Sequence, residues 1–140
     1  MNKPTRPIHT IFLHCSDSDI KAHDNITTIK NWHLQRGFND VGYHYFIRKD
    51  GTIEYGRDLN LIPASQYGYN TGSIAICLSG KDSFYEGQFK SLKKLIQCLE
   101  RDLEKDLKIR LHNEVSSKTC PNFTLQDAGL NYCKVKAIVL

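Results

Sequence analysis

The fold is decided by residues 73–111, SIAICLSGKDSFYEGQFKSLKKLIQCLERDLEKDLKIRL. Residues 73–78 are a short apolar run that ends at Ser79-Gly80, which predicts a central strand. Between 86 and 107, apolar residues recur at helical spacing with Lys and Glu between them, which predicts an amphipathic helix. Residues 108–111 predict a last short strand. A strand, a helix and a strand in succession indicate an α/β fold.

The segments before this stretch continue the alternation. Residues 8–14, IHTIFLH, are β-branched and apolar and predict a buried strand. A helix should follow, capped by Asn25 or Thr27 and ending at Gly37. Its predicted apolar stripe is Ile26, Ile29, Trp32 and His33.

The middle of the chain predicts a hairpin. Residues 41–47 and 52–55 are β-rich and flank an Asp50-Gly51 pair, a strong signal for a tight turn. Residues 56–72 have no clear period and predict a long surface loop. A short helix is expected over 124–134. The fold class is therefore α/β, a single domain with a central mixed β-sheet flanked by helices.

Length and composition limit the function classes. The 140 residues suit one domain over 1–140, with residues 1–7 as an extended leader. A hydrophobic content of 40% and a charged content of 24% exclude a disordered or fibrous protein. The net charge of +4 suits a polyanionic partner such as nucleic acid or bacterial cell wall. Because the basic residues are scattered, with no basic face interleaved with aromatics, a nucleic-acid partner is not expected.

The chain has no apolar run near the roughly 18 residues of a membrane span and no signal-peptide core. We therefore expect cytoplasmic synthesis and no membrane partner. Five cysteines at irregular spacing do not form a disulfide framework, so reduced thiols are expected. One of these thiols can serve as a metal ligand.

Three residues are candidate metal ligands. His112 and Cys120 lie eight residues apart in a polar loop, which by itself is a weak signal. A catalytic zinc has three protein ligands and one open position, so a third must come from elsewhere. His14 is the best candidate, because it ends an apolar strand where α/β sheets present functional groups. The alternative is a hydrogen-bonded core histidine.

Four motifs follow one another along the chain: IFLHCS at 11–16, DVGYHYFI at 40–47 with Asp50-Gly51-Thr52, Gly68-Tyr69-Asn70 with SIAICL at 73–78, and HNEVSSKTCP at 112–121. In this order they resemble the motifs of the zinc-dependent N-acetylmuramoyl-L-alanine amidases, the type 2 amidase family. The match runs from about residue 8 to residue 123, and the phage-lysozyme branch of the family is the most similar. Peptidoglycan recognition proteins share the fold.

The resemblance implies a function and a set of site residues. The metal ligands would be His14, His112 and Cys120, holding one Zn²⁺ per chain. The catalytic residues would be Tyr43 and Lys118. The reaction would be hydrolysis of the amide between N-acetylmuramic acid and L-alanine in peptidoglycan or muropeptides. The alternative is a binding module of the same fold that does not hydrolyse its ligand.

The roles of the two catalytic candidates follow from their chemistry. Lys118 lies two residues before a ligand, where its ammonium can stabilise an oxyanion; alternatively it is a solvated loop lysine. A phenol with a pKa near 10 is a poor base unless a cation lowers it, so Tyr43 can instead donate a hydrogen bond or orient water. Alternation along the predicted strand places Tyr43 and Tyr45 on the same face.

Two positions depart from the family pattern. Cys77 stands where some branches carry a glutamate base. The stretch 63–67 lacks a histidine that the phage-lysozyme branch tends to have, and Ser65 is nearest its place. We expect Ser65 and Asn70 to contact substrate, and Cys15 to point to the other side of its strand.

These features imply peptidoglycan or muropeptides as partners and a monomer as the working form. Without a signal peptide, the protein would reach the cell wall after lysis, holin-assisted release or secretion.

Overall fold

A mixed sheet of five strands forms the centre of the protein in the computed structural model, which describes residues 4–130. The sheet order is β3-β2-β4-β1-β5; β2 and β3 are antiparallel, and the other neighbouring pairs are parallel. The predicted α/β class and the central place of residues 73–78 are confirmed. The strands are β1 (Thr10–Cys15), β2 (Tyr45–Ile47), β3 (Ile53–Tyr55), β4 (Ser73–Leu78) and β5 (Lys108–Leu111).

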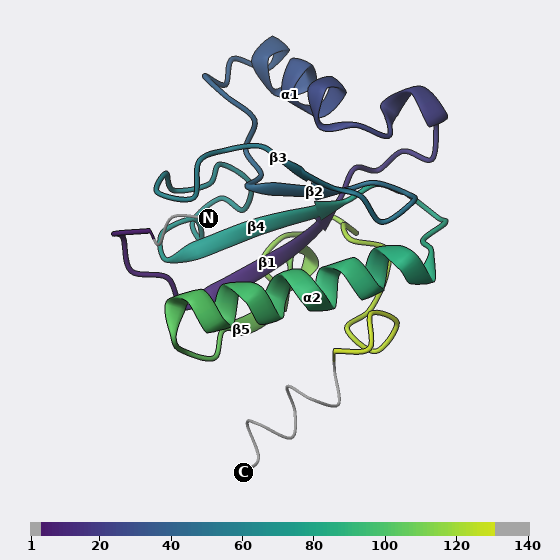
Figure 1. Cartoon of the computed structure of the whole chain (residues 1–140). Helices are drawn as coiled ribbons and strands as arrows, with labels where there is room; N and C mark the ends of the chain where they lie inside the picture. The colour runs from purple at the N-terminus through teal and green to yellow at the C-terminus, as the bar shows by residue number, and fades with distance from the viewer. Residues whose placement is uncertain (1–3, 131–140) are drawn as a thin grey trace.

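The helices α1 (Ile26–Gln35) and α2 (Glu86–Leu103) lie on opposite sides of this sheet (Figure 1). The cap of α1 is Asn25, whose side-chain oxygen accepts a hydrogen bond from the Thr28 amide at 2.8 Å. The helix α2 ends before the predicted residue 107, because Glu104 takes a left-handed conformation with φ of 56°. Two 3₁₀ turns complete the regular structure, η1 (Lys21–His23) and η2 (His112–Glu114).

Side-chain alternation along the strands separates the two faces of the sheet. The face toward α2 carries the larger apolar core, in which alternate residues of β1 and β4 pack on the helix. The face toward α1 holds a smaller apolar cluster and leaves room beside it for polar groups. The larger core includes Ile11, Leu13, Ile74, Ile76, Leu92, Leu95 and Leu99.

The hairpin is present, but its first strand begins at Tyr45 instead of residue 41. The preceding segment is held by α1 and the 56–72 loop: the Gly42 amide donates to His33 Nδ1 at 2.8 Å. A side chain at Gly42 would clash with the Ala64 carbonyl, so glycine is required at this crossing.

This late start corrects the predicted face of Tyr43. Because Tyr43 lies outside β2, strand alternation does not apply to it. Its ring packs in the cluster on the α1 side of the sheet, whereas Tyr45 packs in the core under α2. The prediction that both tyrosines share a face is wrong.

The ends of the described chain differ from expectation. The Arg6 side chain donates hydrogen bonds to the carbonyls of Leu59 and Ser73, which ties the predicted leader to the body of the protein. Residues 124–130 form turns instead of a helix, and 131–134 lie outside the described residues. Within 4–130, the longest helix is too polar to cross a membrane.

Parallel pairing brings two distant histidines to one edge of the sheet. In the register of β1 and β5, Leu13 lies opposite Leu111. The residue that follows each of these two leucines is a histidine: His14 in β1 and His112 just beyond β5. The site is built at this edge, where the carboxyl ends of β1, β4 and β5 meet.

Candidate active site

Three of the predicted site residues converge on one point. The rings of His14 and His112 have centroids 4.5 Å apart. One ligand atom each from His14, His112 and Cys120 lies within 4.8 Å of the other two. The predicted third ligand, His14, thus lies beside the other two candidates.

The loop after η2 folds back to bring Cys120 to the histidines. The Asn113 side-chain amide donates hydrogen bonds to the carbonyls of Thr119 and Pro121 at 3.3 and 3.2 Å. This side chain therefore closes the loop from the inside. Residues 112–120 therefore form a compact loop, which their spacing in the sequence did not indicate.

Two ring nitrogens in this cluster have no partner within the protein. Among the residues 4–130, four buried side-chain nitrogen or oxygen atoms lack a hydrogen bond, and two of them are the Nδ1 atoms of His14 and His112. Buried polar atoms are rarely left unpaired, so such a pair needs an explanation. Two lone pairs and a thiol facing one point fit the donor set of a zinc ion.

The electrostatics keep both imidazoles neutral. Burial, aided by the nearby His112, lowers the pKa of His14 to about 3. Burial and the Lys118 ammonium also lower the pKa of His112. Both rings therefore carry an available lone pair at neutral pH, the form in which histidine binds a metal.

Cys15 interacts with Cys120, contrary to the prediction that it points away from the site. The Cys15 amide donates to the sulfur of Cys120 at 3.1 Å, and the two thiols also contact each other. This contact and burial raise the pKa of Cys120, so its thiol is neutral and a bound cation would displace its proton. Cys15 is the last residue of β1, and it lines the same cavity as Cys120.

Tyr43 and Lys118 flank the cluster. The Tyr43 ring lies 5.0 Å from that of His14, centroid to centroid. Burial raises the pKa of Tyr43 well above its ordinary value, so the phenol stays protonated. Lys118 is exposed at the mouth of the site and close enough to influence both histidines.

Two cavities meet at this point and form one groove. Their volumes are about 530 and 550 Å³. One extends toward Ser65 and Asn70, the other toward Trp32 and Cys15. The residues that line both cavities are His33, Arg36, Tyr43, His112 and Lys118.

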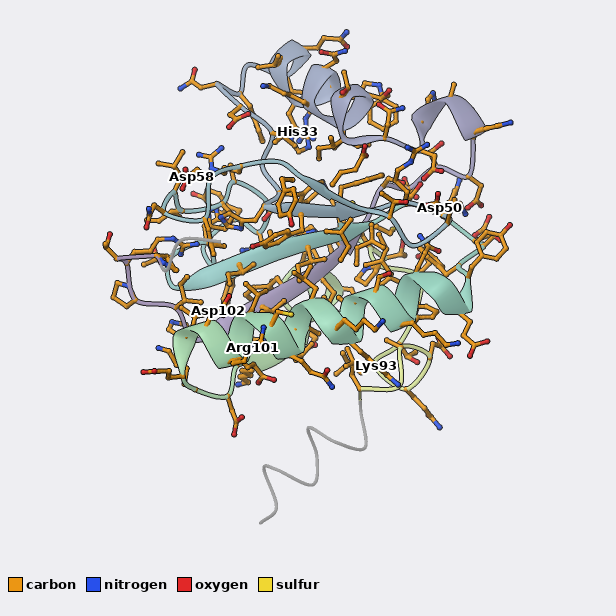
Figure 2. All side chains as sticks on the ribbon, in the orientation of Figure 1. His33, Asp50, Asp58, Lys93, Arg101 and Asp102 are labelled. Atoms are coloured by element: carbon orange, nitrogen blue, oxygen red, sulfur yellow. The ribbon has the colours of Figure 1, made fainter. Side chains whose placement is uncertain are left out.

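His33 and Arg36 were not predicted as site residues. His33 was assigned to the apolar stripe of α1, and Figure 2 shows it on the side of that helix that faces the sheet. It is 6% exposed, and its ring lies 5.2 Å from that of Tyr43. The helical spacing indicated the direction of His33, but only the fold shows that Tyr43 lies opposite it.

The predicted substrate residues Ser65 and Asn70 lie on the wall of the groove. The Asn70 side-chain oxygen accepts hydrogen bonds from the amides of Ser65 and Gln66, at 3.1 and 3.0 Å. Asn70 therefore shapes this part of the 56–72 loop. Gln66, which no sequence pattern singles out, is fully buried, and its Oε1 atom lies 2.8 Å from His14 Nε2.

An α/β sheet whose strand ends carry two histidines, a thiol, a phenol and an ammonium beside a groove defines a class of protein. Neutral imidazoles and a thiolate can hold a Lewis-acid metal, and the ammonium can stabilise an oxyanion. This set of functional groups is typical of a hydrolase that acts on an amide or ester carbonyl.

Comparisons with known proteins identify the family within that class. Residues 4–123 match the N-acetylmuramoyl-L-alanine amidase family. The endolysin of Enterobacteria phage T3 is 36% identical over 132 residues, covering 89% of this chain and 87% of the relative. The endolysin of Escherichia phage T7 is 37% identical over 124 residues, covering 83% and 82%. The amidase LysC of Clostridium intestinale has a similar structure, with a TM-score of 0.80, 26% identity and coverage of 91% and 86%.

The chain belongs to the N-acetylmuramoyl-L-alanine amidase family. It is an enzyme that hydrolyses the amide between N-acetylmuramic acid and L-alanine in peptidoglycan. The predicted family, fold and reaction are confirmed, and the enzyme is favoured over the binding module.

Proposed function

We propose that this amidase works with one zinc ion held by His14, His112 and Cys120. Two unpaired imidazole nitrogens and a thiol that face one point support the proposal. Two histidines and a cysteine leave a fourth position open, which is the pattern of catalytic zinc sites. When bound, zinc supplies Lewis-acid chemistry, which polarises an amide carbonyl and makes water more acidic.

Lys118 has the role of stabilising negative charge on the carbonyl oxygen. Its ammonium stands at the mouth of the groove, beside the histidines. As water adds to the amide, the carbonyl oxygen gains negative charge, and a positive group nearby lowers the energy of that state. Because the Lys118 side chain is exposed, its ammonium is accessible to a substrate in the groove.

Tyr43 acts as a hydrogen-bond donor in this account. Burial raises the pKa of its phenol, which favours the protonated form and therefore the donor role over the base role. Cys77 is equally unsuited to the task of the glutamate that it replaces, because burial raises its pKa well above the ordinary value. A protonated phenol facing the groove can orient the attacking water or the substrate carbonyl.

The groove suits a substrate that extends on both sides of the reacting bond, with the muramyl sugar on one side and the stem peptide on the other. Arg36 and Lys118 line both cavities, so the centre of the groove is basic and complements the carboxylates of a stem peptide. Ser65 and Asn70 would contact one arm of the substrate.

We extend the proposal to one amidase domain over residues 1–140, active as a monomer on the cell wall after release from the cell that makes it.

The metal content tests the proposal. Purified protein should contain about one zinc per chain, since three ligands are available for one ion. A strong chelator should remove both the zinc and the amidase activity, and added zinc should restore them. Elemental analysis that finds no zinc, in a protein whose activity is indifferent to chelators, would reject the zinc site.

Tyr43→Phe tests whether the phenol acts at the site. The change keeps the ring and its packing but removes the hydroxyl, so we expect unchanged stability and a rate lowered by roughly 10²-fold or more, as for loss of a positioned hydrogen-bond donor. The measurements are the melting temperature and the amidase rate at saturating zinc.

Tyr45→Phe is the matched control. Tyr45 packs under α2, on the other face of the sheet, so its hydroxyl does not reach the groove. The amidase rate of the Tyr45→Phe variant should therefore stay near that of the wild type. A full-rate Tyr43→Phe enzyme would reduce Tyr43 to a packing role.

A further inference from the structure

Gln66 is a buried polar residue to which neither the sequence nor the reaction assigns a role. It lies in the 56–72 loop and is 0% exposed. Its side-chain oxygen Oε1 lies 2.8 Å from His14 Nε2, whereas the other ring nitrogen of His14, Nδ1, is buried without a hydrogen-bond partner. The fully buried amide thus contacts one of the three proposed ligands, His14, through the Nε2 atom of its ring.

The orientation of the Gln66 amide is fixed by its other partners. Its nitrogen Nε2 donates to Ser73 Oγ at 2.7 Å and to the Tyr69 carbonyl at 3.3 Å. The Tyr69 carbonyl can only accept, and the Ser73 hydroxyl proton is already donated to the Asn70 carbonyl at 2.8 Å. The nitrogen of the amide must therefore face Ser73 and Tyr69, which leaves the oxygen facing His14.

The same network supports the oxygen from its second side. The Ser65 hydroxyl donates to Gln66 Oε1 at 2.6 Å. With the hydroxyl on one side and His14 on the other, Oε1 accepts two hydrogen bonds, the number that a carbonyl oxygen can take. A flipped amide would place an N–H group against His14 and lose the hydrogen bond from Ser65.

The tautomer of His14 follows from this arrangement. An oxygen acceptor 2.8 Å from Nε2 requires the hydrogen of the neutral ring to be on Nε2. The lone pair is then on Nδ1, the atom that is buried without a hydrogen-bond partner. We propose that Gln66 is a positioning residue that fixes His14 in the Nε2–H tautomer and so presents Nδ1 as the metal ligand.

The ligand part of this inference rests on the proposed zinc site, whereas the tautomer stands without it. Groups behind a metal-binding histidine typically change metal affinity by about 10–100-fold when removed. Because Gln66 belongs to the loop that walls the groove, it also joins the substrate side of the site to the metal side.

The tautomer is measured in metal-free protein by ¹⁵N NMR of the histidine rings. We expect His14 to show a protonated Nε2 and an unprotonated Nδ1. Zinc affinity is then measured by competition with a chelator for the wild type and the variants. Gln66→Leu removes the acceptor and should weaken zinc binding by about 10–100-fold. Gln66→Glu keeps an acceptor facing His14 and should bind zinc at least as tightly as the wild type.

Gln88→Leu is the matched control, because Gln88 is another fully buried glutamine. Its amide donates to the carbonyls of Ile47 and Ser79 and its oxygen accepts from the Tyr85 amide, all away from the metal position. We expect it to lose stability but to keep its zinc affinity. If Gln66→Leu does not fold, the wild-type tautomer and Gln66→Glu still decide the question.

Two results would overturn the inference: a His14 ring protonated at Nδ1 in the metal-free wild type, or equal zinc affinity in folded Gln66→Leu and Gln88→Leu. A Gln66→Glu protein with the weak zinc binding expected of Gln66→Leu would also contradict it. A wild-type protein that binds no zinc would overturn the proposed function and the ligand role together, while the NMR result would still decide the tautomer.

Discussion

Cys120→Ser protein is expected to purify nearly free of zinc and to lose its amidase activity. A thiolate is a strong zinc ligand, whereas a serine hydroxyl does not ionise near neutral pH and binds zinc poorly. The loss of a direct ligand should exceed the roughly 100-fold upper range for residues that only support a ligand. Zinc affinity by chelator competition and the amidase rate measure the two effects.

Cys98→Ser is the control for this experiment. Cys98 lies on α2, on the far side of the sheet, and its sulfur accepts a hydrogen bond from the Arg101 guanidinium at 3.7 Å. It should retain wild-type zinc affinity and rate. Equal zinc retention in the two serine variants would reject Cys120 as a ligand.

Lys118→Ala should separate catalysis from metal binding. The side chain is exposed and stands beside the ligand cluster, so its removal should leave the fold and the zinc in place. The rate should fall by roughly 10²–10³-fold, the range for loss of one group that stabilises an oxyanion. The rate constant, the zinc content and the melting temperature should be measured on the same preparation.

The control for Lys118→Ala is Lys90→Ala, which removes an exposed lysine from α2. Lys90 pairs with Glu86 on that helix, away from the groove. The amidase rate of the Lys90→Ala variant should match that of the wild type. A Lys118→Ala enzyme that turns over normally, or that has lost its zinc, would contradict the oxyanion role.

Local sequence patterns predicted the elements whose formation depends on neighbouring residues. The apolar spacing of 86–107 predicted α2, and the Asp50-Gly51 pair predicted the hairpin, because helical periodicity and turn chemistry are local properties. The central strand β4 was recognisable as a short run that is apolar throughout, as expected of a strand covered on both faces.

The orientation of individual side chains at the site was harder to predict. Alternation placed Tyr43 and Tyr45 on one face and Cys15 away from the site, whereas the two tyrosines pack on opposite faces of the sheet and Cys15 lines the groove. The Gly42 amide, which precedes β2, donates a hydrogen bond to His33 of α1, and that contact joins two elements of the fold. Such a contact leaves no periodic signal in the sequence.

The candidate ligands were identified from residue type and family resemblance, and the fold explains their convergence. The register of β1 and β5 places His14 beside His112, which neither residue's sequence context specifies. Gln66 was missed because a lone glutamine in a loop has no distinctive pattern. Its importance depends on four hydrogen-bond partners that β1, the 56–72 loop and β4 bring together.

The central claim is that the protein is a zinc-dependent amidase, and the products of peptidoglycan digestion test it most directly. Purified peptidoglycan is incubated with wild-type protein, with chelator-treated protein and with treated protein given zinc, and the new termini are identified by mass spectrometry. We expect free L-alanine amino termini and intact glycan chains, formed by the wild-type and zinc-restored samples and absent after chelation. New reducing sugar ends, cleavage within the stem peptide, or the same products after complete zinc removal would contradict the account.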